Sequence, residues 1–342
     1  MITRSALSMH SITSGSHQPT RWQEELAGAI SNPEHLLSLL GLDNSLLSSA
    51  LKANRLFALR APYSYINRIE YGNPEDPLLR QILPLGQEFN EVEGFSADPL
   101  AEQSQNPRHG VIHKYQSRVL LITSGACAVN CRFCFRRHFP YQDNHLSSES
   151  WQQAIEYIAA DSSINEVILS GGDPLAANDR RLTQMASALN EITHLKTLRI
   201  HTRLPVMIPS RVTEEMLGWY TGQRLKPVLV LHCNHPNEID DSVREALSKL
   251  QKAGVTLLNQ SVLLKGINDN AKTLAQLSNT LFQAGVLPYY LHLLDRVKGA
   301  AHFEVSEIEA KQIMRDLMAQ CSGYLVPRLV REIPGEPGKT WI

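Results

Sequence analysis

The chain has 342 residues, of which 43% are hydrophobic and 20% are charged, and its formal net charge is −1. These values are typical of a globular protein in water and exclude a disordered, collagen-like or coiled-coil chain. The balanced charge gives no electrostatic case for nucleic acid or an anionic membrane, so we expect neither as a partner. No apolar run approaches the ~18 residues of a membrane-spanning helix, and residues 1–20 lack the apolar stretch of a signal peptide. We therefore expect a cytoplasmic protein.

The pattern of apolar residues changes near residue 100. Helical spacing predicts a mainly helical region over residues 1–100. Farther on, β-rich runs alternate with amphipathic stretches, which predicts an α/β fold over residues 101–330, followed by a C-terminal segment, 331–342. Its parallel sheet should curl into a full or partial (βα)6-type barrel. The predicted strands are 119–123, 167–170, 198–202, 228–232, 255–259 and 289–293, and the predicted helices are 148–160, 180–192, 238–253, 271–284 and 306–318.

Unusual polar residues stand at the end of each predicted strand. In barrels of this kind, functional residues lie on the loops at the C-terminal ends of the strands. A polar rim built from six separate loops is hard to explain as core packing, so it predicts an active site. In strand order these residues are Cys127, Cys131 and Cys134; Gly171, Gly172 and Asp173; His201, Thr202 and Arg203; His232; Gln260; and Asp295.

The three cysteines have the spacing C-x3-C-x2-C. Three thiolates on one short loop can hold three irons of a [4Fe–4S] cluster. Cys233 and Cys321 are isolated in the sequence, so one iron would stay open for another ligand, and by analogy with zinc an open position indicates a reactive centre. The alternatives are three buried thiols or a zinc knuckle with His138 as its fourth ligand.

This cysteine loop, directly after the first strand of a βα barrel, resembles that of the radical S-adenosylmethionine (SAM) superfamily. The resemblance implies that the open iron binds SAM and that the reduced cluster cleaves it to a 5′-deoxyadenosyl radical, with a flavodoxin- or ferredoxin-type reductant. Gly171, Gly172 and Asp173 resemble the family segment that meets the SAM amino group, although alone they would be an ordinary turn. His232 and Gln260 match segments on the SAM side of the barrel, or they cap strand ends.

A second motif, Pro-Gly-x-x-Gly-Lys, ends at Lys339. On composition alone it would be a frayed tail with a solvated lysine. Together with the cysteine loop it resembles the lysine 2,3-aminomutase family, whose lysine forms a Schiff base with pyridoxal 5′-phosphate (PLP). The resemblance covers Phe57 to Lys339, and it implies that Lys114 and Arg118 hold the PLP phosphate. Otherwise these two residues form a surface charge cluster before a strand.

The same resemblance assigns residues to the substrate. It implies that Arg136 pairs with the substrate carboxylate and that Asp295 binds the ε-ammonium of lysine. A second aspartate expected in the ammonium site is replaced by Glu332, which keeps the charge but adds one methylene. The alternative for Arg136 is a structural cation beside the cluster.

The activity that the resemblance implies is conversion of L-α-lysine to (R)-β-lysine. The chain looks like the bacterial enzyme that supplies this product for attachment to elongation factor P by a separate ligase. It lacks the zinc-binding C-terminal extension of the lysine-degrading members, so we expect iron without stoichiometric zinc, a monomer or small oligomer, and a C terminus anchored by burial of Trp341 and Ile342.

Two other functions remain open at this point. One is an aminomutase for another amino acid such as glutamate, which Asp295 and Glu332 disfavour because they would repel an anionic side chain. The other is a non-catalytic Fe–S or zinc module that docks on a translation component.

Overall fold

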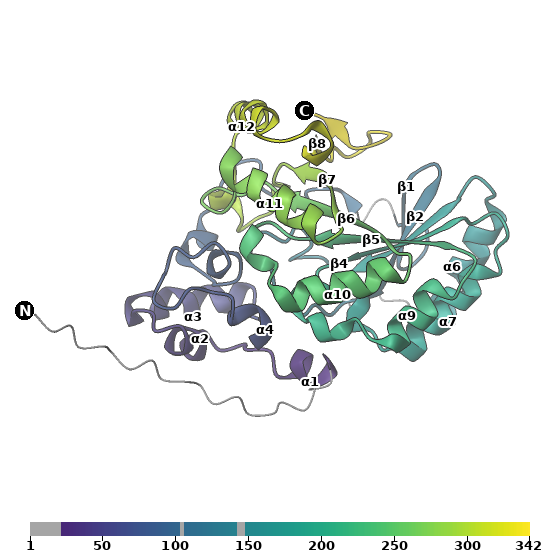
Figure 1. Cartoon of the computed structure of the whole chain (residues 1–342), viewed down its shortest axis with the longest axis horizontal. Coiled ribbons are helices and arrows are strands. Elements are labelled where there is room, and N and C mark those ends of the chain that lie inside the picture. The colour runs from purple at the N-terminus through teal and green to yellow at the C-terminus, as the bar shows by residue number, and fades with distance from the viewer. Residues whose placement is uncertain (1–21, 103–105, 142–147) are drawn as a thin grey trace, which may run out of the picture.

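The computed structural model describes residues 22–102, 106–141 and 148–342. Within these residues the centre of the protein is a nine-stranded sheet in which the strands follow one another in chain order (Figure 1). The strands are β1 (Val111–Tyr115), β2 (Arg118–Ser124), β3 (Glu166–Gly171), β4 (Thr197–Thr202), β5 (Lys226–His232), β6 (Thr256–Val262), β7 (Leu287–His292), β8 (Arg328–Arg331) and β9 (Thr340–Trp341).

Strands β2 to β8 are parallel, whereas β1 and β9 pair antiparallel with β2 and β8 at the two edges of the sheet. In the described residues the two edge strands do not pair with each other, so the sheet is open. The predicted α/β fold is confirmed, in its partial-barrel form. All six predicted strands lie within β2 to β7 or overlap them, whereas β1, β8 and β9 were not predicted.

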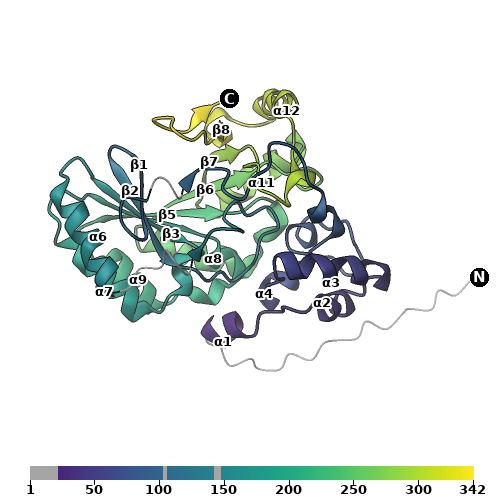
Figure 2. The same ribbon diagram turned by 180° about the vertical axis from the view of Figure 1, so that it is seen from behind.

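Helices cover the outer face of the sheet (Figures 1 and 2). The best-defined amphipathic helix is α10, in which Val243, Ala246, Leu247 and Leu250 recur at helical spacing and are buried. The Asp240 side chain accepts a hydrogen bond from the Val243 amide and so fixes where this helix begins. The helices of this half are α6 (Ser148–Ala160), α7 (Asp179–Asn190), α8 (Leu204–Met207), α9 (Glu214–Thr221), α10 (Asp241–Lys252), α11 (Ala271–Gln283) and α12 (Glu307–Gln320).

The N-terminal helices lie beside the barrel (Figure 2). They are α1 (Trp22–Ala27), α2 (Pro33–Leu39), α3 (Leu47–Leu56) and α4 (Tyr63–Ile66). The segment after α3 contacts the predicted cysteine loop, because the backbone amide of Asn130 donates to the Arg60 carbonyl at 3.0 Å. The Asn130 side chain donates to the Ala58 carbonyl at 2.9 Å. The N-terminal region therefore helps to hold the cysteine loop.

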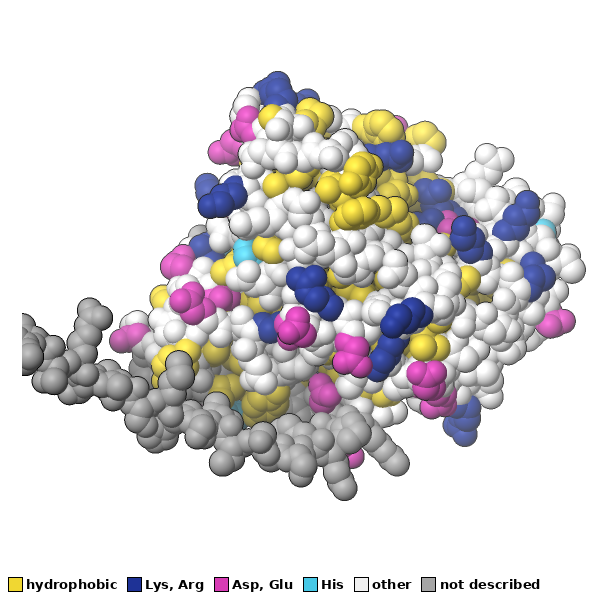
Figure 3. Space-filling view, in the orientation of Figure 1, with side chains coloured by type: hydrophobic (Ala, Val, Ile, Leu, Met, Phe, Trp, Pro, Cys, Tyr) yellow, Lys and Arg dark blue, Asp and Glu magenta, His cyan; other side chains and the backbone are white. Residues whose placement is uncertain are grey.

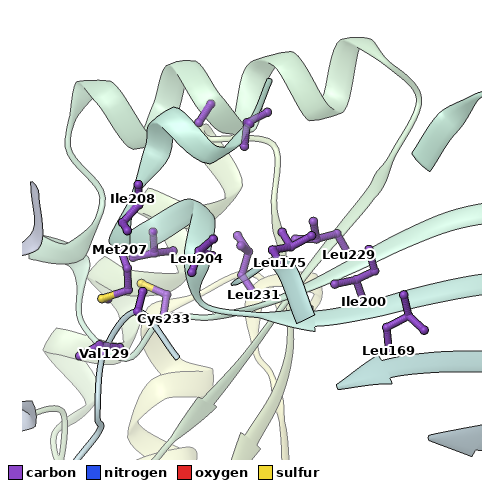
Figure 4. Close-up of a cluster of buried hydrophobic side chains, with 14 of the residues drawn as sticks. Val129, Leu169, Leu175, Ile200, Leu204, Met207, Ile208, Leu229, Leu231 and Cys233 are labelled. Carbon is purple, nitrogen blue, oxygen red and sulfur yellow. The ribbon is translucent and has the colours of Figure 1, made fainter. Parts of the chain in front are cut away.

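The main core lies between the strands and the helices. Figure 4 shows Leu169, Ile200 and Leu229, from three neighbouring strands, pointing to the same side as residues of α8. Cys233 belongs to this core and has no exposed surface, so it is a packing residue. Cys321 ends α12 and packs partly buried against a second apolar cluster.

The surface is mixed in charge. On the face in Figure 3, Lys and Arg side chains are interspersed with Asp and Glu, in agreement with the net charge of −1. No helix in the described part of the chain is both long enough and apolar enough to cross a membrane.

The C terminus corrects one expectation. Trp341 is 67% exposed and lies beside Arg328, whose guanidinium is 4.9 Å from the centre of the indole ring, and Ile342 is half-buried. Successive residues of a strand point to opposite faces, so Trp341 and Ile342 cannot both face the core. The anchor is the backbone pairing of β9 with β8, extended by the Ile342 amide, which donates to the Leu329 carbonyl at 3.1 Å. The Ile342 side chain adds to it by packing against the second apolar cluster, so only the Trp341 part of the expectation is wrong.

Candidate active site

A cavity of about 470 Å³ lies at the C-terminal ends of the parallel strands. It is lined by residues from the N-terminal region, every parallel strand end from β3 to β7, and the C-terminal segment. The structure brings together in this one cavity all the residues that the sequence analysis assigned to a site. They are Lys114, Arg118, Cys127, Cys131, Cys134, Arg136, Gly171, Gly172, Asp173, His232, Gln260, Asp295, Glu332 and Lys339.

The cysteine loop packs against the two glycines after β3. The Gly172 amide donates to the Ser124 carbonyl at 2.7 Å, and the Asp173 amide donates to the Ala126 carbonyl at 2.8 Å. A Cβ at Gly172 would lie 2.5 Å from the Ala126 oxygen, closer than any side chain allows. Gly171 has a φ of +120° and an equally close approach to the Ser124 oxygen. The glycines are therefore required because the loop runs directly over them.

Asp173 joins the ends of β3 and β4. Its carboxylate accepts hydrogen bonds from the Thr202 hydroxyl and from the backbone amides of Leu175, Arg203 and Leu204, at 2.7 to 3.0 Å. Both carboxylate oxygens are thus used within the protein. The Asp173 side chain therefore acts as a bridge that fixes the geometry of the strand ends, and the predicted contact of this segment with SAM stays a prediction.

The three free thiols line the cavity wall, and neither Cys233 nor Cys321 does. Burial, and then the negative charge of a neighbouring thiolate, raise the pKa of Cys134 to about 11, and the same causes raise the pKa of Cys127 well above its usual value. Thiols in such surroundings ionise when a metal centre coordinates them. Within the described residues, no three His, Cys, Asp or Glu side chains are grouped as ligands of a single metal ion.

A guanidinium contacts the middle cysteine. Arg203 Nη1 donates to the Cys131 sulfur at 2.8 Å, while its Nη2 donates to Gln81 at 2.6 Å and to Glu238 at 2.8 Å. Glu238 is fully buried, so this arginine is rigidly held. His138, the predicted fourth ligand of the zinc alternative, lies instead 3.2 Å from the Lys298 carbonyl oxygen.

A chain of alternating charges crosses the cavity wall. Glu332 accepts from Lys339 Nζ and from Lys114 Nζ, each at 2.7 Å. Lys114 also donates to Glu102 at 3.1 Å, and Glu102 in turn pairs with Arg136 through two hydrogen bonds of 2.6 and 2.9 Å. Burial would raise the pKa of Glu332, but the charges of Lys339 and Lys114 outweigh it and lower the pKa. Both of these glutamates are therefore ionised and fully engaged.

Asp295 differs from the two glutamates. No side-chain hydrogen bond or ion pair of Asp295 is present among the described residues, although it is half-buried in the cavity. Burial, and then the charge of Glu332, raise its pKa to about 7. A half-buried carboxylate without a partner is a binding position for a cation.

The strand ends also contribute histidines and tyrosines. The Nε2 atoms of His201 and His292 are buried without a hydrogen-bond partner in the described structure. Burial lowers the pKa of His201, His292 and His232, so all three rings are neutral at physiological pH. His232 is held by Gln260, with 2.6 Å between their side-chain nitrogens. These neutral rings offer donors and acceptors to an uncharged ligand part such as a nucleoside.

Comparison with known proteins identifies the family. Residues 121–277 match the Radical SAM superfamily. The chain is 53% identical over 332 residues to the L-lysine 2,3-aminomutase of Escherichia coli (strain K12), an alignment that covers 97% of each protein. It is 54% identical to that of Haemophilus influenzae over 93% of this chain and 94% of the relative, and 36% identical to that of Clostridium subterminale over 93% and 77%. The chain belongs to the lysine 2,3-aminomutase family.

Members of this family are radical SAM isomerases that use a [4Fe–4S] cluster, SAM and PLP. The residues of this chain fit the cluster and SAM. Three free thiols share one wall, and the loop that carries them is held against Gly171 and Gly172. The unpartnered Nε2 of His201 lies in the same cavity, where a bound ligand could use it.

The residues also fit PLP. Lys339 directly precedes β9, and its amine lies in the cavity 5.9 Å from the centre of the Tyr290 ring. Arg118 stacks on Tyr115, with its guanidinium 4.2 Å from the ring centre, and forms no ion pair with any described residue. Lys114 and Arg118 would therefore hold the phosphate group.

Sequence reasoning missed several residues of the cavity wall. Glu102 precedes the first predicted strand, at 119–123, so no positional signal marked it. Tyr290 lay inside a predicted strand and read as an ordinary β residue. Arg203 stood among the polar residues predicted after the strands, but its contact with Cys131 was not predicted, because that contact depends on Gln81 and Glu238, which come from two other parts of the chain.

Proposed function

We propose that this enzyme converts L-α-lysine to (R)-β-lysine by moving the amino group from C2 to C3. The observation that carries the proposal is the placement of Arg136 and Asp295 in the same cavity as Lys339. A guanidinium suits the carboxylate of an amino acid, and an unpartnered carboxylate suits a distal ammonium group. Lysine carries both charged groups. The relatives named as L-lysine 2,3-aminomutases support the same substrate.

The charges of the cavity argue against glutamate as the substrate. A side-chain carboxylate would approach Asp295, Glu332 and Glu102, of which the two glutamates are held ionised by neighbouring cations. Desolvating a further anion among them is unfavourable. The lysine side chain places an ammonium there instead and meets attraction from Asp295.

The family cofactors, when bound, supply the radical that abstracts hydrogen and the electron-withdrawing ring that makes amino migration possible. The protein's own side chains bind and orient. Glu332 accepts a hydrogen bond from the amine of Lys339 at 2.7 Å and so orients it, and this amine can act as a nucleophile only in its unprotonated form. The residues from β3 to β7 that line the cavity would limit the access of water to a radical formed there.

We also propose a biological role, which the resemblance of the chain supports. The product would be attached by a separate ligase to a lysine of elongation factor P, and the reaction would take place in the cytoplasm with a flavodoxin- or ferredoxin-type reductant.

The test is anaerobic incubation of the reconstituted enzyme with L-lysine, SAM, PLP and dithionite, followed by chiral separation of the products. We expect (R)-β-lysine, and we expect no β-glutamate when glutamate replaces lysine. The Cys131→Ser variant is the control for radical chemistry and should form neither product. Turnover of glutamate in preference to lysine would contradict the proposal.

A further inference from the structure

We propose that Glu102 is a positioning residue that holds the guanidinium of Arg136 in the orientation that binds the substrate carboxylate. The inference rests on the proposed function, in which Arg136 has that role. Glu102 itself has no part in the reaction as described so far. Its two oxygens are within hydrogen-bonding distance of two cations of the cavity wall, Arg136 and Lys114.

The geometry of the pair divides the guanidinium into two edges. Arg136 donates from Nε to one oxygen of Glu102 at 2.6 Å and from Nη2 to the other at 2.9 Å. On the remaining edge, Nη1 donates to the Ser170 hydroxyl at 3.1 Å and only weakly to the Gly171 carbonyl, at 3.4 Å. The second N–H of Nη2 and the weakly held N–H of Nη1 form the edge that is left for a second carboxylate.

Burial makes it unfavourable for a substrate to displace Glu102. The side chains of Glu102 and Arg136 are 4% and 7% exposed. Separating them would leave two buried charges uncompensated. The free energy lost in this way exceeds the free energy gained from one new contact with the substrate carboxylate. Burial would raise the pKa of Glu102, but the charge of Arg136 outweighs it, so the pKa is lowered and the pair stays ionised. The substrate therefore meets an arginine that is already fixed in place.

The fixed orientation has a consequence for affinity. A free arginine side chain loses rotational freedom when it binds, and that loss weakens binding. With Glu102 on one edge, the guanidinium is ordered before the substrate arrives. The same carboxylate also contacts Lys114, so it spaces the arginine from the lysine that we assign to the phosphate.

Two variants separate geometry from charge. Glu102→Asp keeps the charge but is one methylene too short to reach both Arg136 and Lys114, whereas Glu102→Gln keeps the size and removes the charge. The ligands are lysine and cadaverine, which has the same distal ammonium group but no carboxylate. Calorimetric titration of each into protein that contains its cluster and PLP gives a ratio of dissociation constants, cadaverine over lysine, that reports carboxylate binding alone.

We expect both variants to lower this ratio by roughly 10- to 100-fold, with cadaverine affinity changed by less than about twofold. Asp179→Asn is the matched control, because it removes a carboxylate from another buried arginine, Arg211, which lies outside the cavity. Asp179→Asn should leave the ratio unchanged, even where its melting temperature falls as much as that of the Glu102 variants. This comparison separates a local effect from general destabilisation.

The other outcomes overturn one claim or the other. An unchanged ratio in both Glu102 variants overturns the positioning role. Tighter lysine binding in Glu102→Gln also overturns it and makes Glu102 a competitor of the substrate. A wild-type protein that does not prefer lysine to cadaverine would instead refute the proposed function, because Arg136 would then not bind the substrate carboxylate.

Discussion

The charges around Lys339 fall into two classes at the scale of single residues. Glu102 and Glu332 each contact two cations, and these contacts keep their carboxylates ionised. Asp295 has no such contact, and its pKa is raised to about 7 by burial and by Glu332. The cavity thus holds one carboxylate whose charge depends on what binds to it. A substrate ammonium would complete the alternating pattern.

Asp295→Asn should therefore reduce the use of lysine specifically. A hydrogen bond to a charged group contributes about 1.5–3 kcal/mol, so kcat/KM for lysine should fall roughly 10- to 150-fold. Norleucine, in which a hydrogen replaces the terminal ammonium of lysine, is the matched test compound. Its binding constant should change little in the variant. Equal losses for lysine and norleucine would show that the ammonium is bound elsewhere.

The raised pKa of Asp295 also predicts a pH dependence. Above about pH 7 the carboxylate is ionised in the free enzyme and attracts the substrate ammonium, and below that pH it is protonated and the attraction is lost. For the wild-type enzyme, kcat/KM for lysine should fall toward tenfold per pH unit below about 7. The profile of Asp295→Asn should lack this limb. If kcat/KM of the variant falls over the same pH range, the titrating group is not Asp295.

At the scale of elements, the site depends on close contact between the turn after β3 and the cysteine loop. Gly172 does not have a positive φ, so a side chain is excluded there by space and not by backbone conformation. Gly172→Ala should push the loop from the turn and lower the iron content to roughly half or less. Gly218→Ala is the control, since no atom lies within 4 Å of its added Cβ. Full iron content in both variants would contradict this account of the loop.

The β8–β9 pair is the element that carries Lys339. Deleting residues 340–342 removes β9 and the hydrogen bond from the Ile342 amide to the Leu329 carbonyl. Lys339 should then no longer be held at the cavity, and PLP occupancy should fall at least several-fold. Trp341→Ala should have little effect, because this side chain is exposed. Absorbance of bound PLP and borohydride labelling measure both. A loss of PLP in Trp341→Ala as large as that in the deletion would contradict this account, because it would make the Trp341 side chain the anchor.

At the scale of the whole molecule, the spacing of apolar residues predicted the strands and helices whose formation depends on that spacing. Period-2 and period-3.6 spacing gave β2 to β7 and the helix Ser148–Ala160, whose bounds match the structure. The short strands β1, β8 and β9 are stabilised by pairing with neighbours rather than by their own composition, so no pattern marked them. Glu102 escaped for the same reason, because its role comes from Arg136, a residue distant in sequence. Trp341 is exposed because of the way β9 pairs with β8, and this pairing could not be predicted from the sequence.

The two halves of the site are held by different parts of the molecule. The cysteine loop is fixed by the turn after β3 and the N-terminal region, and Lys339 is fixed by β8 and β9. Lys339→Ala should accordingly abolish PLP binding but leave iron content and SAM binding within about twofold of wild type, since Glu332 keeps its pair with Lys114 and no buried charge is left alone. Lys298→Ala, which removes an exposed lysine paired with Glu91, should change none of the three. Loss of iron together with PLP in Lys339→Ala, with the control intact, would mean that the two halves are coupled through the chain of charges from Glu332 to Arg136.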